Sequence, residues 1–444
     1  MNIKLSKIAK LLSLELIGDD QDIKNLSIDS REVKNGDLFV AIKGENHDGH
    51  NYIQESIKNG ASAILCNDKF DSSKISVSHI LCKNTLKSLG LFALGYKKII
   101  GSPYTIGITG TNGKTTVTKL TAEILSQSFS VSTTIGNYNN DIGLPLSILG
   151  SESENYQKCI YELGASKRND INNLVNICEP DMTTLLNVSE AHMESFGSFE
   201  NLINTKEEIF HHSNIKRVVL NKDDKYFHKW KEINSSREIT TISINNKADY
   251  FIEKNVESYI YLSTPKGRIK ISKADSSGLL LINLLFSTAL AMEAGAGIQS
   301  VIDGLRSFSG VKGRFYCFVS SNKALIIDDS YNANPESMRS SLNQLKYFKK
   351  DKIFVMGDMG ELGEKSLIHH LSIFKLAKNI GVKHLLYMGK YKNEAKSTFG
   401  DGCMTFNDII ELTNHARKVS NETTAVLIKA SRFMNFDKIA EGLK

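Results

Sequence analysis

The stretch Thr105-Ile-Gly-Ile-Thr-Gly-Thr-Asn-Gly-Lys-Thr-Thr116 joins a short β-branched run to a glycine-rich turn. After the turn, apolar residues recur at helical spacing as far as Leu125. This pattern predicts a strand, a loop and a helix in direct succession. Gly110 and Gly113 let the loop backbone curl so that its N–H groups point into one cup, and the helix N-terminus behind the cup adds partial positive charge.

A cup of this kind is suited to the phosphates of a nucleotide. Lys114 would supply a full positive charge to the outer phosphates, and the Thr115 hydroxyl is placed to bind the accompanying Mg²⁺. The glycine spacing differs from that of the standard phosphate loop, so a turn that only caps a helix is the alternative. The residues expected to contact phosphate are Gly110, Thr111, Asn112, Gly113, Lys114, Thr115 and Thr116.

The composition is that of an ordinary globular protein. Its 444 residues suggest about three domains, and 41% hydrophobic residues suffice for real cores. The net charge of +6 is mild, and the lysines form no basic run, so nucleic acid is not an expected partner. The six cysteines lie far apart without a Cys-x-x-Cys pair, which is typical of reduced thiols in the cytoplasm.

Neither export nor membrane insertion is expected. The amino-terminal segment is amphipathic and charged throughout, unlike a signal peptide. The most apolar segment, Leu279 to Met292, is interrupted by Asn283 and is shorter than the ~20 residues that a membrane span requires. We therefore expect a cytoplasmic monomer in which this segment is a buried helix.

The order of apolar and polar segments predicts an α/β protein of three domains. Residues 1–102 alternate short helical and strand patterns and are expected to form a small α/β domain. Residues 103–311 are typical of a doubly wound, mostly parallel sheet that carries the phosphate loop. After a linker at Gly310–Arg314, residues 312–444 repeat the alternation and predict a Rossmann-like domain.

Two polar residues follow strands of the central domain. Glu162 lies near the end of the strand Lys158–Leu163, and His192 comes shortly after the strand Asp181–Val188. Because ligands bind at the carboxyl edge of a parallel sheet, both could hold Mg²⁺ or order water near the phosphates. The alternatives are an ion pair for Glu162 and a turn cap for His192. Mg²⁺ prefers oxygen ligands, which favours Glu162.

Taken together, the motifs resemble those of the Mur ligases, which use ATP to add amino acids to the peptide stem of peptidoglycan precursors. Thr109–Thr116 is similar to the phosphate loop of that family, including its spacing. Within the family, three segments resemble the members that add D-alanyl-D-alanine. These are Gly136–Leu146, Asp329–Pro335 and Gly357–Gly363. The Asp-Asn-Pro-Arg motif of the members that add the third residue does not occur in the sequence.

The resemblance implies roles for individual residues. It makes Thr115, Glu162, His192 and Lys206 the Mg²⁺ ligands, with Lys206 acting as an N-carbamate. It makes Lys114, His192, Lys206 and Arg314 the catalytic residues, and it adds Asn283, Arg314 and Asp329 to the nucleotide contacts. It assigns Ser30 and Arg31 to the uridine nucleotide, and Asn139, Asn140, Asn332 and Asn334 to substrate binding. One departure is Gly278-Leu-Leu-Leu281, where the family usually has a polar group.

The resemblance also implies a reaction. ATP would phosphorylate the terminal carboxylate of UDP-N-acetylmuramoyl-tripeptide, and D-alanyl-D-alanine would attack the acyl phosphate. The active site would lie between the second and third domains. The alternatives are a sibling Mur ligase or folylpolyglutamate-type ligase with another amine, a P-loop nucleotide switch, and a scaffold that has lost catalysis.

Overall fold

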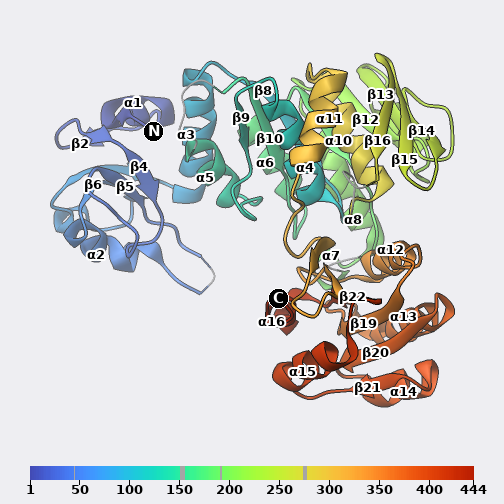
Figure 1. Cartoon of the computed structure of the whole chain (residues 1–444). Helices are drawn as coiled ribbons and strands as arrows, with labels where there is room; N and C mark the ends of the chain where they lie inside the picture. Colours follow the sequence, from blue (N-terminus) through green and yellow to red (C-terminus); the bar gives the residue numbers. More distant parts are fainter. Residues whose placement is uncertain (45, 151–155, 191–192, 274–277) are drawn as a thin grey trace.

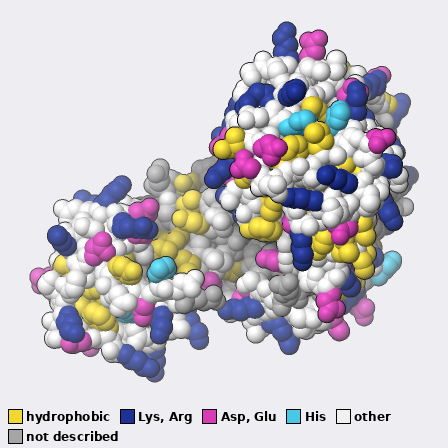
Figure 2. All heavy atoms as spheres, turned by 90° about the horizontal axis from the view of Figure 1, so that it is seen from below, with side chains coloured by type: hydrophobic (Ala, Val, Ile, Leu, Met, Phe, Trp, Pro, Cys, Tyr) yellow, Lys and Arg dark blue, Asp and Glu magenta, His cyan; other side chains and the backbone are white. Residues whose placement is uncertain are grey.

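The computed structural model describes residues 1–44, 46–150, 156–190, 193–273 and 278–444. Figure 1 shows the first hundred residues beside the central part of the chain, with the carboxy-terminal part below it. On the face shown in Figure 2, basic and acidic side chains are intermixed, and hydrophobic side chains gather in the hollow beside the smaller, amino-terminal body. No described helix is long and apolar enough to cross a bilayer.

The amino-terminal part contains a sheet in the order β2-β7-β6-β5-β4, in which β2 is antiparallel and the others run parallel. Its strands are β2 (Leu16–Ile17), β4 (Asn25–Ser27), β5 (Asp37–Val40), β6 (Ala61–Asn67) and β7 (Ser78–Cys82), with β1 (Ile3–Lys4) and β3 (Asp22–Ile23) forming a separate antiparallel pair. The helices are α1 (Leu5–Leu12), η1 (Gly49–Tyr52), α2 (Ile53–Lys58), η2 (Ser72–Lys74) and α3 (Thr85–Ile99).

The central sheet has the order β16-β15-β14-β13-β12-β11-β8-β10-β9. Its strands are β8 (Tyr104–Thr109), β9 (Val131–Thr133), β10 (Lys158–Glu162), β11 (Met182–Leu185), β12 (Arg217–Asn221), β13 (Glu238–Ser243), β14 (Tyr250–Asn255), β15 (Tyr259–Thr264) and β16 (Gly267–Ser272). The sheet is parallel from β9 to β14, as the alternating pattern predicts. It then continues into antiparallel β15 and β16, an extension that the sequence analysis did not anticipate.

Helices cover both faces of this sheet (Figure 1). They are α4 (Lys114–Ser126), α5 (Gly143–Leu149), α6 (Asp170–Cys178), α7 (Met193–Phe196), α8 (Phe199–Glu207), η3 (Glu208–Phe210), α9 (Phe227–Ile233), α10 (Leu281–Glu293) and α11 (Ile298–Ser307). The apolar segment around Asn283 is α10, and it packs against α4 behind the phosphate loop. The expectation of a buried helix there is confirmed, because its residues from Asn283 to Met292 are buried.

The carboxy-terminal sheet has the order β17-β18-β22-β19-β20-β21, with only the β17–β18 pair antiparallel among its described strands. The strands are β17 (Tyr316–Val319), β18 (Leu325–Asp328), β19 (Asp351–Gly357), β20 (Val382–Met388), β21 (Cys403–Thr405) and β22 (Thr424–Lys429). The helices are α12 (Pro335–Leu345), η4 (Gly363–Lys365), α13 (Ser366–Asn379), α14 (Lys392–Phe399), α15 (Ile409–Val419), η5 (Arg432–Met434) and α16 (Asp437–Gly442). Asn334 caps α12 and Pro335 is its first residue.

Helix α3 connects the amino-terminal and central parts through a shared core. It packs against α1 on one side and against α5 and α6 on the other, and the buried apolar residues of both parts form one continuous cluster. Gly90 allows close approach to α6, because a Cβ atom there would lie 3.0 Å from the Ile177 side chain. Lys97 reinforces this contact. Its buried ammonium donates hydrogen bonds to the carbonyls of Cys178 and Glu179 at the end of α6.

We expect Lys97→Met to lower the free energy of unfolding by about 1–3 kcal/mol, because two carbonyls at the end of α6 would lose their charged donor. Thermal and urea denaturation followed by circular dichroism would measure the loss. Lys98→Met is the matched control, since Lys98 is exposed and pairs with Glu179 at 3.4 Å. Equal effects of the two substitutions would contradict a special role for Lys97.

Candidate active site

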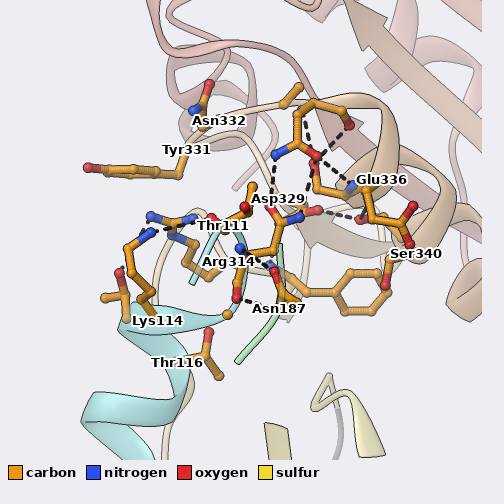
Figure 3. A pocket seen from close by; sticks show the side chains of 18 of the residues that line it. Thr111, Lys114, Thr116, Asn187, Arg314, Asp329, Tyr331, Asn332, Glu336 and Ser340 are labelled. Atoms are coloured by element: carbon orange, nitrogen blue, oxygen red, sulfur yellow. Dashed lines mark hydrogen bonds between the residues drawn. The ribbon is translucent and has the colours of Figure 1, made fainter. Parts of the chain in front are cut away.

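A cavity of about 740 Å³ lies between the phosphate loop and the carboxy-terminal part of the chain (Figure 3). Its walls come from the loop after β8, the ends of β10 and β11, the start of α10, and the segments around Asp329, α12 and η5. The strands β8, β10 and β11 run parallel, so their carboxyl ends open into this cavity together. The site is therefore built at the sheet edge where the sequence pattern predicts it.

The side chain of Asn187 fixes the phosphate loop onto the end of β11. Its Oδ1 accepts a hydrogen bond from the Asn112 N–H at 2.9 Å, and its Nδ2 donates to the Asn112 carbonyl at 2.9 Å. The Asn187 carbonyl also accepts from the N–H of Thr111. The loop is thus held by hydrogen bonds to the end of the central strand β11. Asn187 was not among the predicted site residues, although it lies near the end of the predicted strand Asp181–Val188.

Gly113 adopts a φ of +89°, a conformation that glycine tolerates and that other residues rarely adopt. A Cβ atom at this position would lie 2.8 Å from Oδ1 of Asn283. The structure therefore brings Asn283 against the phosphate loop, and both residues line the cavity. The neighbouring wall is apolar, because Leu280 and Ile282 also line the cavity there.

The ammonium of Lys114 folds back onto the loop that precedes it. It donates hydrogen bonds to the carbonyls of Gly110 at 2.9 Å and Thr111 at 3.3 Å. Burial lowers the pKa of Lys114, Glu162 raises it in part, and Arg314 lowers it further. An anion in the cup would replace the two carbonyls as the partner of this ammonium and would favour its charged form.

Glu162 is buried at the end of β10 with both carboxylate oxygens engaged. Thr115 donates its hydroxyl to Oε2 at 2.8 Å, and Asn139 donates its amide to Oε1 at 2.7 Å. Carboxylate and hydroxyl oxygens are ligands that Mg²⁺ prefers, so the donor chemistry of Glu162 and Thr115 suits this ion. His192, the other predicted ligand, lies outside the described residues.

Lys206 is buried in the last turn of α8, with 4% of its surface exposed. Burial and the nearby charge of Lys114 lower its pKa to about 7, although Glu162, Asp170 and Glu208 oppose the shift. A single helical lysine is ordinarily solvated, so this burial sets Lys206 apart. Near neutral pH a large fraction of its side chain is an uncharged amine, which is the nucleophilic form.

Arg314 reaches from the interdomain linker to the loop. Its guanidinium lies 3.5 Å from the Thr115 hydroxyl and stacks on the Tyr331 ring, 3.8 Å from the ring centroid. In Figure 3, Arg314 and Lys114 lie on the same side of the cavity. Two cations therefore converge on the place where a nucleotide would put its phosphates.

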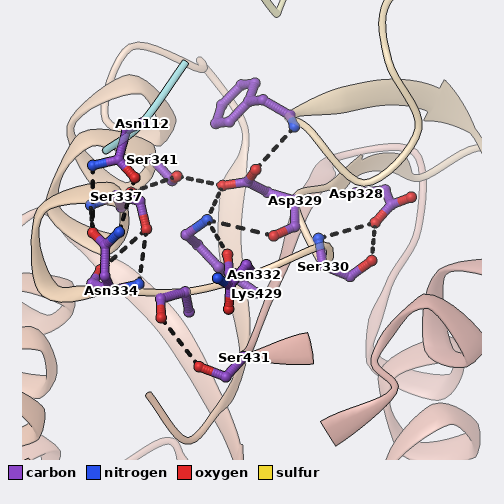
Figure 4. A network of polar contacts seen from close by, with 12 residues as sticks. Asn112, Asp328, Asp329, Ser330, Asn332, Asn334, Ser337, Ser341, Lys429 and Ser431 are labelled. Carbon is purple, nitrogen blue, oxygen red and sulfur yellow. Dashed lines mark hydrogen bonds and ion pairs between the residues drawn. The ribbon is translucent and has the colours of Figure 1, made fainter. Parts of the chain in front are cut away.

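Asp329 forms a buried network rather than an open acidic site (Figure 4). One oxygen accepts from the N–H of Phe315, and the other accepts from the hydroxyl of Ser341 and from the ammonium of Lys429 at 2.6 Å. Lys429 also donates to the Asn332 carbonyl at 3.0 Å. Burial lowers the pKa of Lys429, and the carboxylate beside it opposes that shift.

A pair of side-chain amides joins the phosphate loop to the carboxy-terminal part. Asn334 donates its amide to Oδ1 of Asn112 at 2.8 Å, while its own oxygen accepts from the N–H of Ser337 as the cap of α12 (Figure 4). Asn332 and Asn139 also line the cavity, whereas Asn140 does not. Asn140 accepts hydrogen bonds from the N–H groups of Ile142 and Gly143.

Comparison with known proteins identifies the chain. It matches the models for "Mur ligase family, catalytic domain" at residues 22–95, "Mur ligase middle domain" at 108–291 and "Mur ligase, glutamate ligase domain" at 313–432. It is 33% identical to the UDP-N-acetylmuramoyl-tripeptide–D-alanyl-D-alanine ligase of Haemophilus influenzae, across 100% of this chain and 99% of that protein. The chain belongs to the Mur ligase family.

Solved structures of Mur ligases support the same conclusion. A crystal structure of MurF from Acinetobacter baumannii has a TM-score of 0.88 at 25% identity and covers 100% of this chain and 99% of its own. The MurF ligase of Thermotoga maritima in complex with ADP has a TM-score of 0.83 at 29% identity and covers 95% of this chain and 97% of its own. The family resemblance inferred from the motifs is confirmed, and the chain is an ATP-dependent ligase.

The residues predicted for the uridine nucleotide lie in the amino-terminal part of this Mur ligase. The Ser30 hydroxyl donates to Glu55 at 2.8 Å, and Arg31 pairs with Asp29 on the surface. The guanidinium of Arg31 lowers the pKa of Asp29 to about 2. Neither residue lines the central cavity, so a substrate that contacts both regions would have to extend from one to the other.

We expect Lys114→Ala to weaken ATP binding by about 10- to 100-fold, because a charge-assisted contact to phosphate would be lost. Isothermal titration calorimetry with a non-hydrolysable ATP analogue would measure the change. Circular dichroism would verify that the variant is folded, since the substitution removes the ammonium that donates to the carbonyls of Gly110 and Thr111. Unchanged affinity in a folded variant would contradict the phosphate-binding role.

Proposed function

We propose that this chain joins D-alanyl-D-alanine to UDP-N-acetylmuramoyl-tripeptide, with ATP converted to ADP and phosphate. The observation that carries the proposal is the end-to-end similarity to ligases named for this reaction, combined with a cavity that connects the phosphate loop to the carboxy-terminal part. The catalytic problem is that a carboxylate is a poor electrophile. Transfer of the γ-phosphoryl group gives an acyl phosphate that a neutral amine can attack.

Different residues of the cavity would bind the nucleotide, the metal ion and the substrates of this reaction. Lys114 and Arg314 would offset the charge on the transferring phosphoryl group, and the loop N–H groups would hold the inner phosphates. Glu162 and Thr115 would hold Mg²⁺, together with His192 and with Lys206 as a carbamate. The bound ion would supply further positive charge at the phosphates. Asn283 and Asp329 would contribute to the nucleotide site, and Asn139, Asn332 and Asn334 to the substrate site.

Phosphate release tests this assignment. We expect release to require ATP, Mg²⁺, UDP-N-acetylmuramoyl-tripeptide and D-alanyl-D-alanine together, with the pentapeptide product detected by mass spectrometry. Single amino acids should not replace the dipeptide. Release with another amine would indicate a sibling ligase. Slow ATP turnover that ignores both the tripeptide and the dipeptide would favour a nucleotide switch.

The proposed carbamate on Lys206 predicts a pH dependence with a definite sign. Since the pKa of Lys206 is lowered to about 7, its amine is protonated below that pH and cannot add to CO₂. We expect activity in CO₂-depleted buffer to fall, to be restored by bicarbonate, and to be restored least at pH 6. Ligation rates from pH 6 to 9 would measure this effect.

Lys206→Glu is the informative variant, because it supplies a carboxylate that needs no CO₂. We expect it to keep part of the activity and to lose the response to bicarbonate, whereas Lys206→Met should be inactive in both buffers. A parent enzyme that is indifferent to bicarbonate at every pH would refute the carbamate.

A further inference from the structure

The cavity is lined by four cationic side chains among the described residues, and they are not equivalent. They are Lys114, Arg314, Lys429 and Arg432. A ligase that joins a dipeptide to a phosphorylated carboxylate must hold two kinds of anion. One is the polyphosphate of ATP, and the other is the free carboxylate at the far end of the dipeptide. The contacts of the four cations indicate which of them is available for the second anion.

Three of the four cations already have another role in the cavity. Lys114 and Arg314 lie at the phosphate loop, as described above. Lys429 is 2% exposed, and its ammonium is used by the Asp329 carboxylate at 2.6 Å and the Asn332 carbonyl at 3.0 Å. A substrate carboxylate could reach Lys429 only by disrupting this buried network, which would leave Asp329 without its counter-charge.

Arg432 differs in exposure and in partners. Its side chain is 59% exposed, and its ionic contact is to Asp437, 3.3 Å from Nη1. Within the described part of the chain, its Nε and Nη2 groups make no hydrogen bond. This leaves an edge of the guanidinium with the geometry that binds a carboxylate through two parallel hydrogen bonds.

Tyr331 lies beside both arginines of the cavity. Arg314 lies 3.8 Å from the centroid of its ring, and Arg432 lies 5.8 Å from the same centroid. The aromatic ring therefore interacts with both guanidinium groups. The cavity thus has a second cationic position besides the one at the phosphate loop.

The backbone beside Arg432 is fixed, and its surroundings suit small apolar groups. The Ser431 hydroxyl accepts from the N–H of Gly360 at 2.8 Å and donates to the Ala333 carbonyl at 3.1 Å. Phe433 lines the cavity with 64% of its surface exposed. Leu362, which follows Gly360 closely in the sequence, also lines the cavity. An exposed aromatic side chain at a cavity wall can cover methyl groups of a ligand.

We propose that Arg432 binds the carboxylate of the incoming dipeptide, with Phe433 covering its methyl groups. This inference rests on the proposed function, because it takes D-alanyl-D-alanine as the amine substrate. The carboxylate at Arg432 would direct the other end of the dipeptide, its amine, toward the acyl phosphate at the loop. Arg432 would then be a specificity residue that selects a free carboxylate.

The test combines a change in the enzyme with a change in the substrate. The parent enzyme, Arg432→Met and Arg432→Lys are each assayed with D-alanyl-D-alanine and with its C-terminal amide, which lacks the carboxylate. We expect Arg432→Met to raise the KM for the dipeptide by about 10- to 100-fold while the KM for ATP and for the tripeptide substrate stays within about twofold. Arg432→Lys should lie between, because it keeps the charge but not the two-point contact.

The amide decides the assignment. For the parent enzyme, the KM for the amide should exceed the KM for the acid by about 10- to 100-fold. Arg432→Met should no longer discriminate between the acid and the amide. Arg417→Met is the matched control, because Arg417 lies on α15, does not line the cavity and contacts Asn414 at 3.0 Å. It should retain the full preference for the acid.

Two outcomes would overturn the inference while leaving the proposed function in place. The first is an Arg432→Met enzyme that still prefers the acid as strongly as the parent does. The second is a rise in the KM for the tripeptide substrate instead of the dipeptide. A parent enzyme that ligates neither form of the dipeptide would instead refute the proposed function.

Discussion

The site depends on the attachment of the phosphate loop to the end of β11. Asn187 uses its side-chain amide and its carbonyl to engage Thr111 and Asn112, so the loop continues the hydrogen bonding of the parallel sheet beyond the last strand residue. This attachment sets the direction of the loop N–H groups before any ligand binds. The position of Lys114 follows from it, and so does the contact of Asn112 with Asn334 across the cavity.

Charge is distributed unevenly around that fixed loop. Asp329 and Lys429 neutralise each other in a buried network that joins the strand ends of the carboxy-terminal sheet. The Glu162 carboxyl group accepts hydrogen bonds from Thr115 and Asn139, and burial lowers the pKa of Lys206 to about 7. The Asp329–Lys429 pair is thus part of the cavity wall. Glu162 and Lys206, in contrast, lie where a nucleotide and a metal ion would add their own charges.

Much of the fold could be predicted from the sequence, because the alternation of apolar strands and amphipathic helices is strong. The segments around Gly110 and Glu162 were predicted at strand ends, and the structure has them there. The antiparallel extension β15–β16 was missed, since hydrophobic alternation indicates a strand but not the direction in which it pairs.

Contacts that join distant segments were beyond the sequence. Asn187, Tyr331, Lys429 and Arg432 line the cavity because of how distant segments pack, and nothing in the spacing of these polar residues distinguishes a cavity wall from a solvated surface. The burial of Lys206 likewise depends on how α8 packs, which periodicity alone does not specify. Lys206 was predicted as a site residue from the family resemblance and not from composition or spacing.

The packing of α3 between the amino-terminal and central parts has a consequence for the order of folding during synthesis. The amino-terminal sheet and α1 emerge first and can cover only one side of this helix. Its other side is covered only after α5 and α6 have been synthesised. The carbonyls that accept hydrogen bonds from Lys97 belong to Cys178 and Glu179, about eighty positions later in the chain. A nascent chain of intermediate length therefore carries an uncovered apolar helix face, which favours aggregation and chaperone binding during this interval of translation.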